Sequence, residues 1–251
     1  MTETNLSGHV ILVTGGAGAI GAAITRRLLR GGAEVIWTDI DPLAEASADP
    51  EIKSRGHFLC HDVGASEDWA TVEAYIGETF GRLDGLVNNA GIYLRENIED
   101  ASVESVRRVM RVNLEGAMLG CQMALRLMGD TGSIVNVASV AGLRPGSQTL
   151  SYGMSKAALL NLTQSVARYA IDRKRKIRCI AICPGSVETA MSEKALEGVN
   201  PAIVDKLFRQ STVQGRMAQP EEIASMAVFL LSPEASFATG APFLIDGGLM
   251  L

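Results

Sequence analysis

Residues 9–29 read HVILVTGGAGAIGAAITRRLL, and this stretch decides the fold. The apolar, β-branched run over residues 9–14 predicts a buried strand, and the apolar spacing after Gly21 predicts a helix. The glycines between them let backbone N–H groups approach a pyrophosphate, and the start of the helix adds a partial positive charge. Tight turns also use glycine without binding anything. Strand, glycine turn and helix in this order nevertheless favour a dinucleotide-binding site.

A second apolar strand, predicted over residues 34–38, ends at Asp39. Asp39 lies 18 residues beyond Gly21, about where an acidic side chain accepts the hydroxyl groups of an adenosine ribose. A carboxylate there would repel a ribose phosphate, and neither the glycine turn nor the three residues after Asp39 contain Arg or Lys. We therefore expect NAD rather than NADP as cofactor. The alternative is that Asp39 and Asp41 simply begin a polar turn before Pro42.

Ser139, Tyr152 and Lys156 form the second informative group. A strand predicted over residues 132–138 ends at Ser139, and a helix predicted to start near Tyr152 places Lys156 on the same face one turn later. A phenol has an ordinary pKa near 10, which a neighbouring ammonium group lowers towards the range of a general base. A Tyr–Lys pair on a helix is more often a half-buried ring beside a solvated neighbour. Together with the glycine turn, the three residues favour hydride transfer on an alcohol or ketone.

Apolar strands and helical patterns alternate along the rest of the chain without a repeat or a low-complexity linker. We predict strands at residues 10–14, 34–38, 57–60, 84–87, 132–138, 177–182 and 242–245. This alternation predicts an α/β fold with a doubly wound parallel sheet (Rossmann fold) that binds ligands at the carboxyl ends of its strands. Because α/β folds of this length are commonly one domain, we expect residues 1–251 to form a single domain.

Composition narrows the possible partners. The net charge is −5 with both signs interspersed, so we expect no nucleic-acid partner. The basic run Arg173–Lys176 is short and is expected to be a solvated turn. No run approaches the ~18 apolar residues that span a bilayer, so we expect no membrane partner.

Histidine and cysteine show no metal-binding or disulfide pattern. His9, His57 and His61 have no ligand spacing with cysteine or acidic residues beyond the adjacent His61 and Asp62, so we expect no metal. The four cysteines are scattered, and none belongs to a Cys-x-x-Cys pair. Residues 1–8 carry no basic-then-apolar signal pattern, and we expect a reducing, cytoplasmic location.

These motifs resemble the short-chain dehydrogenase/reductase family over essentially the whole chain. The turn Thr14-Gly15-x-x-x-Ala19-x-Gly21 matches the family's Thr-Gly-x-x-x-Gly-x-Gly pattern except at Ala19, where a methyl group replaces the usual glycine and narrows the approach to the phosphates. The further matches, in chain order, are Asn88-Asn89-Ala90-Gly91, the helix residue Asn113, the 13-residue interval from Ser139 to Tyr152, then Lys156, and Pro184-Gly185-x-Val187-x-Thr189.

The resemblance implies roles for these residues. Tyr152 would be the general acid or base at the substrate oxygen, and Ser139 would hydrogen-bond that oxygen. Lys156 would lower the pKa of the phenol and hold the nicotinamide ribose, and Asn113 would orient a water behind Lys156. The expected NAD-binding residues are Gly15, Gly18, Ala19, Ile20, Gly21, Asp39, Asp62, Val63, Asn89, Ala90, Gly91, Tyr152, Lys156, Pro184, Gly185, Val187 and Thr189.

Asp62 and Val63 follow the strand at residues 57–60, and by the resemblance they would flank the adenine. Asp62 could equally cap a helix near residues 67–80.

The substrate is less clearly indicated. By the resemblance, residues 190–219 form a mobile lid, and Arg95, Arg144, Gln148 and Met191 face the substrate. The first three hint at a polyol, a sugar or a hydroxy acid, although each is also consistent with an exposed loop. The enzymatic alternative is an NADPH-dependent 3-oxoacyl reductase, which Asp39 disfavours. The non-enzymatic alternative is a regulatory protein that binds a dinucleotide without catalysis.

The resemblance also implies a homotetramer. Its contacts would involve helices predicted near residues 102–127 and 152–171 and the strand near the carboxyl terminus. The chain ends Leu249-Met250-Leu251, and an exposed apolar end would be unfavourable in a monomer. We therefore expect these residues to pack against a neighbouring subunit.

Overall fold

The computed structural model describes residues 4–251, apart from the side chains of residues 205 and 207–209. Seven parallel strands form one sheet in the order β3-β2-β1-β4-β5-β6-β7. Their bounds are β1 (Val10–Thr14), β2 (Glu34–Asp39), β3 (His57–Cys60), β4 (Gly85–Asn88), β5 (Thr131–Val137), β6 (Lys176–Pro184) and β7 (Pro242–Ile245). The predicted α/β fold with a doubly wound parallel sheet is confirmed, and each predicted strand is correct to within two residues.

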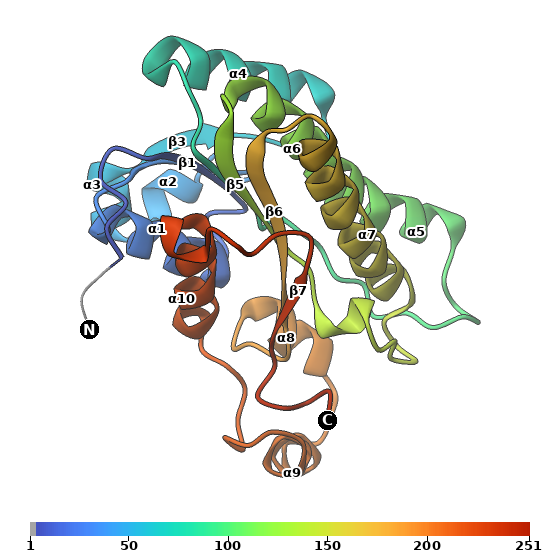
Figure 1. Ribbon diagram of the computed structural model, residues 1–251. Helices are drawn as coiled ribbons and strands as arrows, with labels where there is room; N and C mark the ends of the chain where they lie inside the picture. Colours follow the sequence, from blue (N-terminus) through green and yellow to red (C-terminus); the bar gives the residue numbers. More distant parts are fainter. Residues whose placement is uncertain (1–3) are drawn as a thin grey trace.

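Helices cover both faces of this sheet (Figure 1). One face carries α1 (Ala19–Arg30), α2 (Ala44–Ser47), α3 (Pro50–Arg55) and α10 (Pro220–Leu231). The other carries α4 (Ser66–Phe80), α6 (Gly116–Leu127) and α7 (Leu150–Asp172), with α5 (Val103–Met110) packed on α7. The short helices are η1 (Arg111–Glu115), η2 (Val140–Gly142) and η3 (Pro233–Ala235), and α8 (Ala190–Leu196) and α9 (Pro201–Ser211) lie beyond the sheet.

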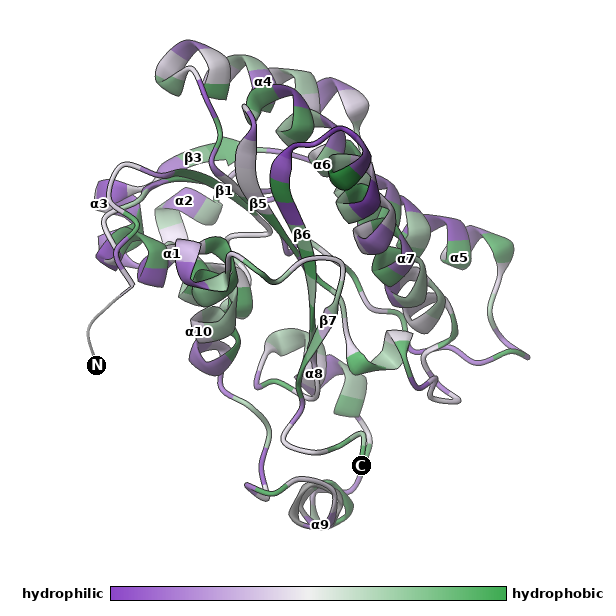
Figure 2. Cartoon of the chain, in the orientation of Figure 1, coloured by the Kyte–Doolittle hydropathy of each residue, from purple (hydrophilic) through white to green (hydrophobic). Residues whose placement is uncertain are grey.

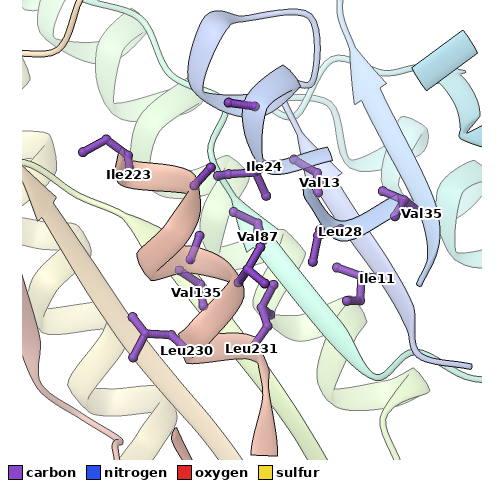
Figure 3. Close-up of a cluster of buried hydrophobic side chains, with 14 of the residues drawn as sticks. Ile11, Val13, Ile24, Leu28, Val35, Val87, Val135, Ile223, Leu230 and Leu231 are labelled. Atoms are coloured by element: carbon purple, nitrogen blue, oxygen red, sulfur yellow. The ribbon is translucent and has the colours of Figure 1, made fainter. Parts of the chain in front are cut away.

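The core lies in two apolar layers, one on each side of the sheet. Alternate residues of β1 enter different layers, because successive side chains of a strand point to opposite faces. Ile11 and Val13 pack with side chains of α1 and α10, such as Leu28 (Figure 3), whereas Val10 and Leu12 pack towards α4 and α6. Full burial of one such side chain contributes about 1.5–3 kcal/mol. Figure 2 accordingly shows hydrophobic colour along β1 and alternating colours around α4.

The order of the strands creates the binding edge. From β1 the chain proceeds to β2 and β3 on one side, and β4 then pairs with β1 on the other. A crevice forms outside the carboxyl ends of the strands at such a reversal, and ligands bind there. Thr14, Asp39 and Asn88 end β1, β2 and β4, so they lie at this edge.

The helix predicted near residues 102–127 is interrupted. Between α5 and α6 the backbone widens into the π-helical turn η1, which contains the buried Asn113. Such turns are rare and frequently occur at functional sites. Hydrophobic spacing alone gave no indication of this turn.

The basic run Arg173–Lys176 is not simply a solvated turn, as was predicted. The guanidinium group of Arg175 is half-buried and donates to the carbonyls of Leu125, Met128 and Gly129 at 3.0, 2.6 and 2.7 Å. These carbonyls end α6, where helices leave backbone acceptors without partners. Arg175 therefore caps α6. Across residues 4–251, none of the helices has the length and apolar character needed to cross a membrane.

Candidate functional site

A cleft of about 510 Å³ opens at the carboxyl ends of the strands. It is lined by nearly all the residues predicted for the cofactor: Gly15, Gly18, Ala19, Ile20, Asp39, Asp62, Val63, Asn89, Ala90, Gly91, Tyr152, Lys156, Pro184, Gly185, Val187 and Thr189. Ser139 also lines it, whereas Gly21 and Asn113 lie behind the lining. The motifs that are far apart in the sequence thus meet around one cleft.

The glycine turn leaves the start of α1 open to the cleft. At Gly21, a side-chain carbon would overlap the carbonyl of Gly15, so the turn requires glycine there. Within the described residues, no side chain caps α1 at Gly18, and its first turn contains no acidic residue. The first N–H groups of a helix lack partners within the helix and attract anions. The residues present therefore fit a cofactor pyrophosphate, and Ala19 belongs to the lining of the cleft.

Asp39 faces the glycine turn. Its Oδ2 accepts the Ala17 N–H at 3.0 Å and its Oδ1 accepts the Asp41 N–H at 3.3 Å. Asp41 in turn accepts the Leu43 N–H at 2.9 Å, so this segment is also the polar turn that the alternative interpretation described. The two interpretations are compatible, because Asp39 itself lines the cleft.

Asp62 does not cap α4, so that alternative is wrong. Its Oδ1 accepts the Gly64 N–H at 2.8 Å, and its Oδ2 pairs with Arg111 Nη2 at 3.2 Å. Near the start of α4 it is Asp68 whose carboxylate accepts the Asp62 N–H at 2.8 Å. Asp62 is thus oriented by a backbone donor and a guanidinium group at the wall of the cleft.

Sequence reasoning missed two arginines of this wall. Arg108 and Arg111 both line the cleft, and they precede Asn113 on the same helical segment. Their three-residue separation puts them on one helical face, and this spacing could have identified them.

His61 also lines the cleft, although it was considered only as a metal ligand. Its ring is buried against Trp69 and its Nδ1 lies 3.1 Å from the Thr38 hydroxyl. Burial lowers the pKa of His61 to about 4, so the ring is neutral near neutral pH. Residues 4–251 contain no described group of three or more His, Cys, Asp or Glu side chains that could hold a metal ion.

Lys156 is buried in the part of the cleft that Ser139 and Tyr152 also line. Its Nζ donates to the Val137 carbonyl at 2.7 Å and lies 5.6 Å from the centre of the Tyr152 ring. Burial lowers the pKa of Lys156 to about 8. The group is therefore mostly protonated near neutral pH, with its charge held close to the phenol.

The pKa of Tyr152 differs from the sequence expectation. Burial raises the pKa of the phenol above its ordinary value, and a hydrogen bond with Ser139 opposes that rise. The expected lowering of the Tyr152 pKa by Lys156 is therefore not found in this structure. The free-energy cost of removing the phenolate from water exceeds the stabilisation that the neighbouring donors give it.

Asn113 joins three segments behind the cleft. Its Oδ1 accepts the Ile92 N–H at 2.8 Å, and its Nδ2 donates to the Ile92 carbonyl and to the Ser155 hydroxyl, both at 3.0 Å. The π-helical turn is thereby tied to the segment after Gly91 and to the first turns of α7. This amide therefore ties the π-helical turn and the segment after β4 to α7, the helix that carries both Tyr152 and Lys156.

The four predicted substrate residues separate into two groups. Met191 lines the cleft, together with Ala190 and Ser192, which sequence reasoning did not identify. Arg95, Arg144 and Gln148 are exposed and lie outside the lining. Arg95 instead donates from Nη1 to the Glu197 carbonyl at 3.0 Å, just beyond α8.

The segment expected to be a lid, residues 190–219, contains α8 and α9 and lies at the bottom of Figure 1. Its two ends meet at a bridge between Val187 and Ala218. There the Glu188 N–H donates to the Ala218 carbonyl and the Ala218 N–H donates to the Ser186 carbonyl, both at 2.9 Å. The segment therefore leaves and rejoins the fold at one point beside the cleft.

Comparison with known proteins agrees with this geometry. A family model described as enoyl-(acyl carrier protein) reductase matches residues 15–250. The 3-beta-hydroxysteroid dehydrogenase of Comamonas testosteroni is 36% identical, with 98% of this chain and 97% of that protein aligned. The NADP-dependent (R)-specific alcohol dehydrogenase of Lentilactobacillus kefiri is 33% identical over 99% of this chain and 98% of that protein. Ligand-free aldohexose dehydrogenase of Thermoplasma acidophilum superposes with a TM-score of 0.85 at 32% identity, covering 98% of this chain and 95% of that one.

Proposed function

Because this chain belongs to the short-chain dehydrogenase/reductase family, whose members here are dehydrogenases acting on hydroxyl groups, we propose that it is an NAD-dependent enzyme using Tyr152 as general acid or base. It interconverts a secondary alcohol and a ketone. The observation that carries the proposal is that one cleft is lined both by Asp39 and by Ser139, Tyr152 and Lys156.

The proposed chemistry assigns one task to each side chain. When bound, the nicotinamide ring accepts or returns a hydride at the carbinol carbon. In the oxidation direction, Ser139 donates a hydrogen bond to the substrate oxygen, and the Tyr152 phenolate takes the hydroxyl proton. The buried Lys156 ammonium stabilises that phenolate. In reduction, the Tyr152 phenol returns the proton to the oxygen.

The proposed cofactor is NAD, and Asp39 is the support for it. A carboxylate that accepts ribose hydroxyls repels a phosphate at the same position. Since one relative is NADP-dependent, the relatives alone leave both cofactors open. We expect Asp39→Asn to lower the ratio of kcat/KM for NAD to that for NADP by roughly 10-fold or more, the range expected for a lost charged hydrogen bond. Asp41→Asn is the matched control, and an unchanged ratio in Asp39→Asn would contradict the assignment.

The proposed substrate is an uncharged secondary alcohol, such as a sugar, a polyol or a hydroxysteroid. An anionic hydroxy acid was considered because of Arg95, Arg144 and Gln148. These side chains lie outside the cleft lining, so an anionic substrate is less well supported. On the lid side, the described lining is Ala190, Met191 and Ser192, which are uncharged. The names of the relatives include a steroid, an alcohol and a sugar dehydrogenase.

The deciding experiment follows the absorbance of reduced nicotinamide while the protein is offered secondary alcohols, polyols, sugars, hydroxysteroids and hydroxy acids with NAD or NADP. We expect turnover with NAD that falls by roughly 10²–10⁴-fold in Tyr152→Phe, while NADH binding is retained. Turnover only with NADPH and 3-oxoacyl substrates would favour the reductase alternative. NADH binding without turnover on any substrate would favour the non-catalytic alternative.

We also propose that residues 1–251 act as a single domain with residues 190–219 as its lid, and that four copies assemble in the cytoplasm. Residues 1–3 of this range lie outside the described residues. The free cysteines Cys121, Cys179 and Cys183 are buried, which is consistent with a reducing compartment.

A further inference from the structure

Tyr93 lies beside the reaction site, and neither the sequence motifs nor the expected roles included it. Its ring meets the Tyr152 ring edge to face, with centroids 5.4 Å apart and planes at 73°. Tyr93 follows β4, two residues after Gly91, whereas Tyr152 belongs to the first turn of α7. Aromatic pairs favour this T-shaped arrangement at such a distance.

Tyr93 is itself anchored to the residues that lead into α7. Its hydroxyl donates to the Gln148 carbonyl at 3.1 Å. The same carbonyl accepts the Glu96 N–H at 3.3 Å, and the Leu150 N–H donates to the Glu96 carbonyl at 3.2 Å. The segment that carries Tyr93 is therefore fixed to the start of the helix that carries Tyr152.

The Tyr152 ring is held from several directions. Lys156 Nζ lies 5.6 Å from its centroid, Ser139 hydrogen-bonds its hydroxyl, and Tyr93 packs edge to face with it. Burial raises the pKa of Tyr93 above its ordinary value, so its hydroxyl remains protonated and keeps donating to Gln148. The bond that anchors the Tyr93 ring beside Tyr152 is therefore kept near neutral pH.

We propose that Tyr93 is a positioning residue for Tyr152: its ring fixes the orientation of the catalytic phenol and excludes water from one side of it. Tyr93 acts through Tyr152 and takes no proton from the substrate. This inference rests on the proposed function, because it concerns the group assigned as the general acid or base.

Two substitutions separate the ring from the hydroxyl. Tyr93→Leu removes the aromatic edge, and we expect kcat to fall by roughly 2- to 12-fold, the range for loss of one aromatic pair. Tyr93→Phe keeps the ring and loses only the bond to Gln148, so it should restore most of kcat. The KM for NAD should stay unchanged in both variants.

The pH dependence of kcat distinguishes a positioning residue from one that only stabilises the fold, because a loss of stability alone would leave this pH dependence unchanged. Water admitted by Tyr93→Leu stabilises the phenolate, so the pH at which oxidation activity rises should shift downwards. Tyr75→Leu is the matched control, since Tyr75 is also a partly buried aromatic residue whose hydroxyl is bonded, lying 3.0 Å from His57 Nδ1. This control should lower stability and leave kcat and its pH dependence unchanged.

A titration without substrate tests the same point independently of turnover. The phenolate absorbance of the chain minus that of Tyr152→Phe isolates the Tyr152 ionisation, and the same difference is measured in the Tyr93→Leu background. We expect Tyr152 to ionise at lower pH when Tyr93 is replaced. An unchanged ionisation of Tyr152 in the Tyr93→Leu background would overturn the proposal even if no substrate were found. A Tyr93→Leu protein in which only the KM for the alcohol changed, with kcat unaffected, would also overturn it. Absence of wild-type turnover would count against the proposed function alone.

Discussion

Lys156 is a buried cation whose ammonium group donates to a single described carbonyl, that of Val137. Burial lowers its pKa from 10.5 to about 8, so the unfolded chain binds a proton more tightly than the folded one. By linkage, the folded state gains stability as the pH rises from about 8 to 10.5, and it lacks this stability near neutral pH. The shift corresponds to roughly 3 kcal/mol at neutral pH.

We therefore expect the free energy of unfolding of Lys156→Met to exceed that of the wild type near neutral pH by about 1–2 kcal/mol, a figure that allows for the lost bond to Val137. The variant should accordingly unfold at a higher denaturant concentration. The advantage should shrink as the pH approaches 10.5, because the wild-type side chain then loses its charge. Urea unfolding of both proteins across this range measures the difference. Lys53→Met, an exposed lysine on α3, is the control, and a Lys156→Met protein that is less stable at every pH would contradict the argument.

Single residues could be predicted from the sequence where their motif fixes their place. Gly15, Asp39 and Ser139 sit at strand ends, and the structure places all three in the cleft. Arg95 lies outside the cleft lining, and its bond to the Glu197 carbonyl could not be predicted, because Glu197 is far away in sequence. The pKa of Tyr152 depends on burial, which a four-residue spacing to Lys156 does not reveal.

At the scale of elements, Arg95 connects the segment after β4 to the chain just beyond α8. Through its bond to the Glu197 carbonyl it contacts residues 190–219, the proposed lid. Losing one exposed hydrogen bond is worth about 0.5–1.5 kcal/mol, which corresponds to roughly 2- to 12-fold in an equilibrium constant. We expect Arg95→Ala to raise the KM for the alcohol by that factor, while NAD binding is unchanged.

Steady-state kinetics of Arg95→Ala and Arg144→Ala distinguish a lid contact from a substrate contact. Arg144 is exposed and lies outside the cleft lining, so its replacement should leave KM unchanged. If both substitutions raised KM equally for an anionic substrate alone, the original assignment of these arginines to the substrate would be restored.

The elements themselves show why periodicity predicts some features and not others. Buried parallel strands are near-continuous apolar runs, so β1 and β6 are evident in the sequence. The π-helical turn at Arg111–Glu115 adds no distinctive residue type, and it follows from contacts such as those of Asn113 with Ile92 and Ser155. Bonds of this kind form between distant segments and leave no local signal.

At the scale of the whole molecule, two separate apolar surfaces remain uncovered in the described chain. The first is an open groove of about 620 Å³ between α6 and α7, lined by residues that include Met118, Leu125 and Leu162. The second lies around the edge strand β7, where Leu244 is 49% exposed and Leu251 at the terminus is 108% exposed. Apolar patches of this kind mark interaction sites.

Two independent two-fold interfaces on one chain generate a closed tetramer. We therefore expect light scattering to give a mass four times the 26.6 kDa of the single chain. Leu244→Glu should disrupt one interface and Met118→Glu the other, so each should leave dimers, because a charge buried in an apolar contact is strongly unfavourable. Combining both substitutions should leave monomers that retain the fold by circular dichroism. A wild-type mass of a single chain would contradict the assembly, and the exposed Leu244 and Leu251 would then require a different partner.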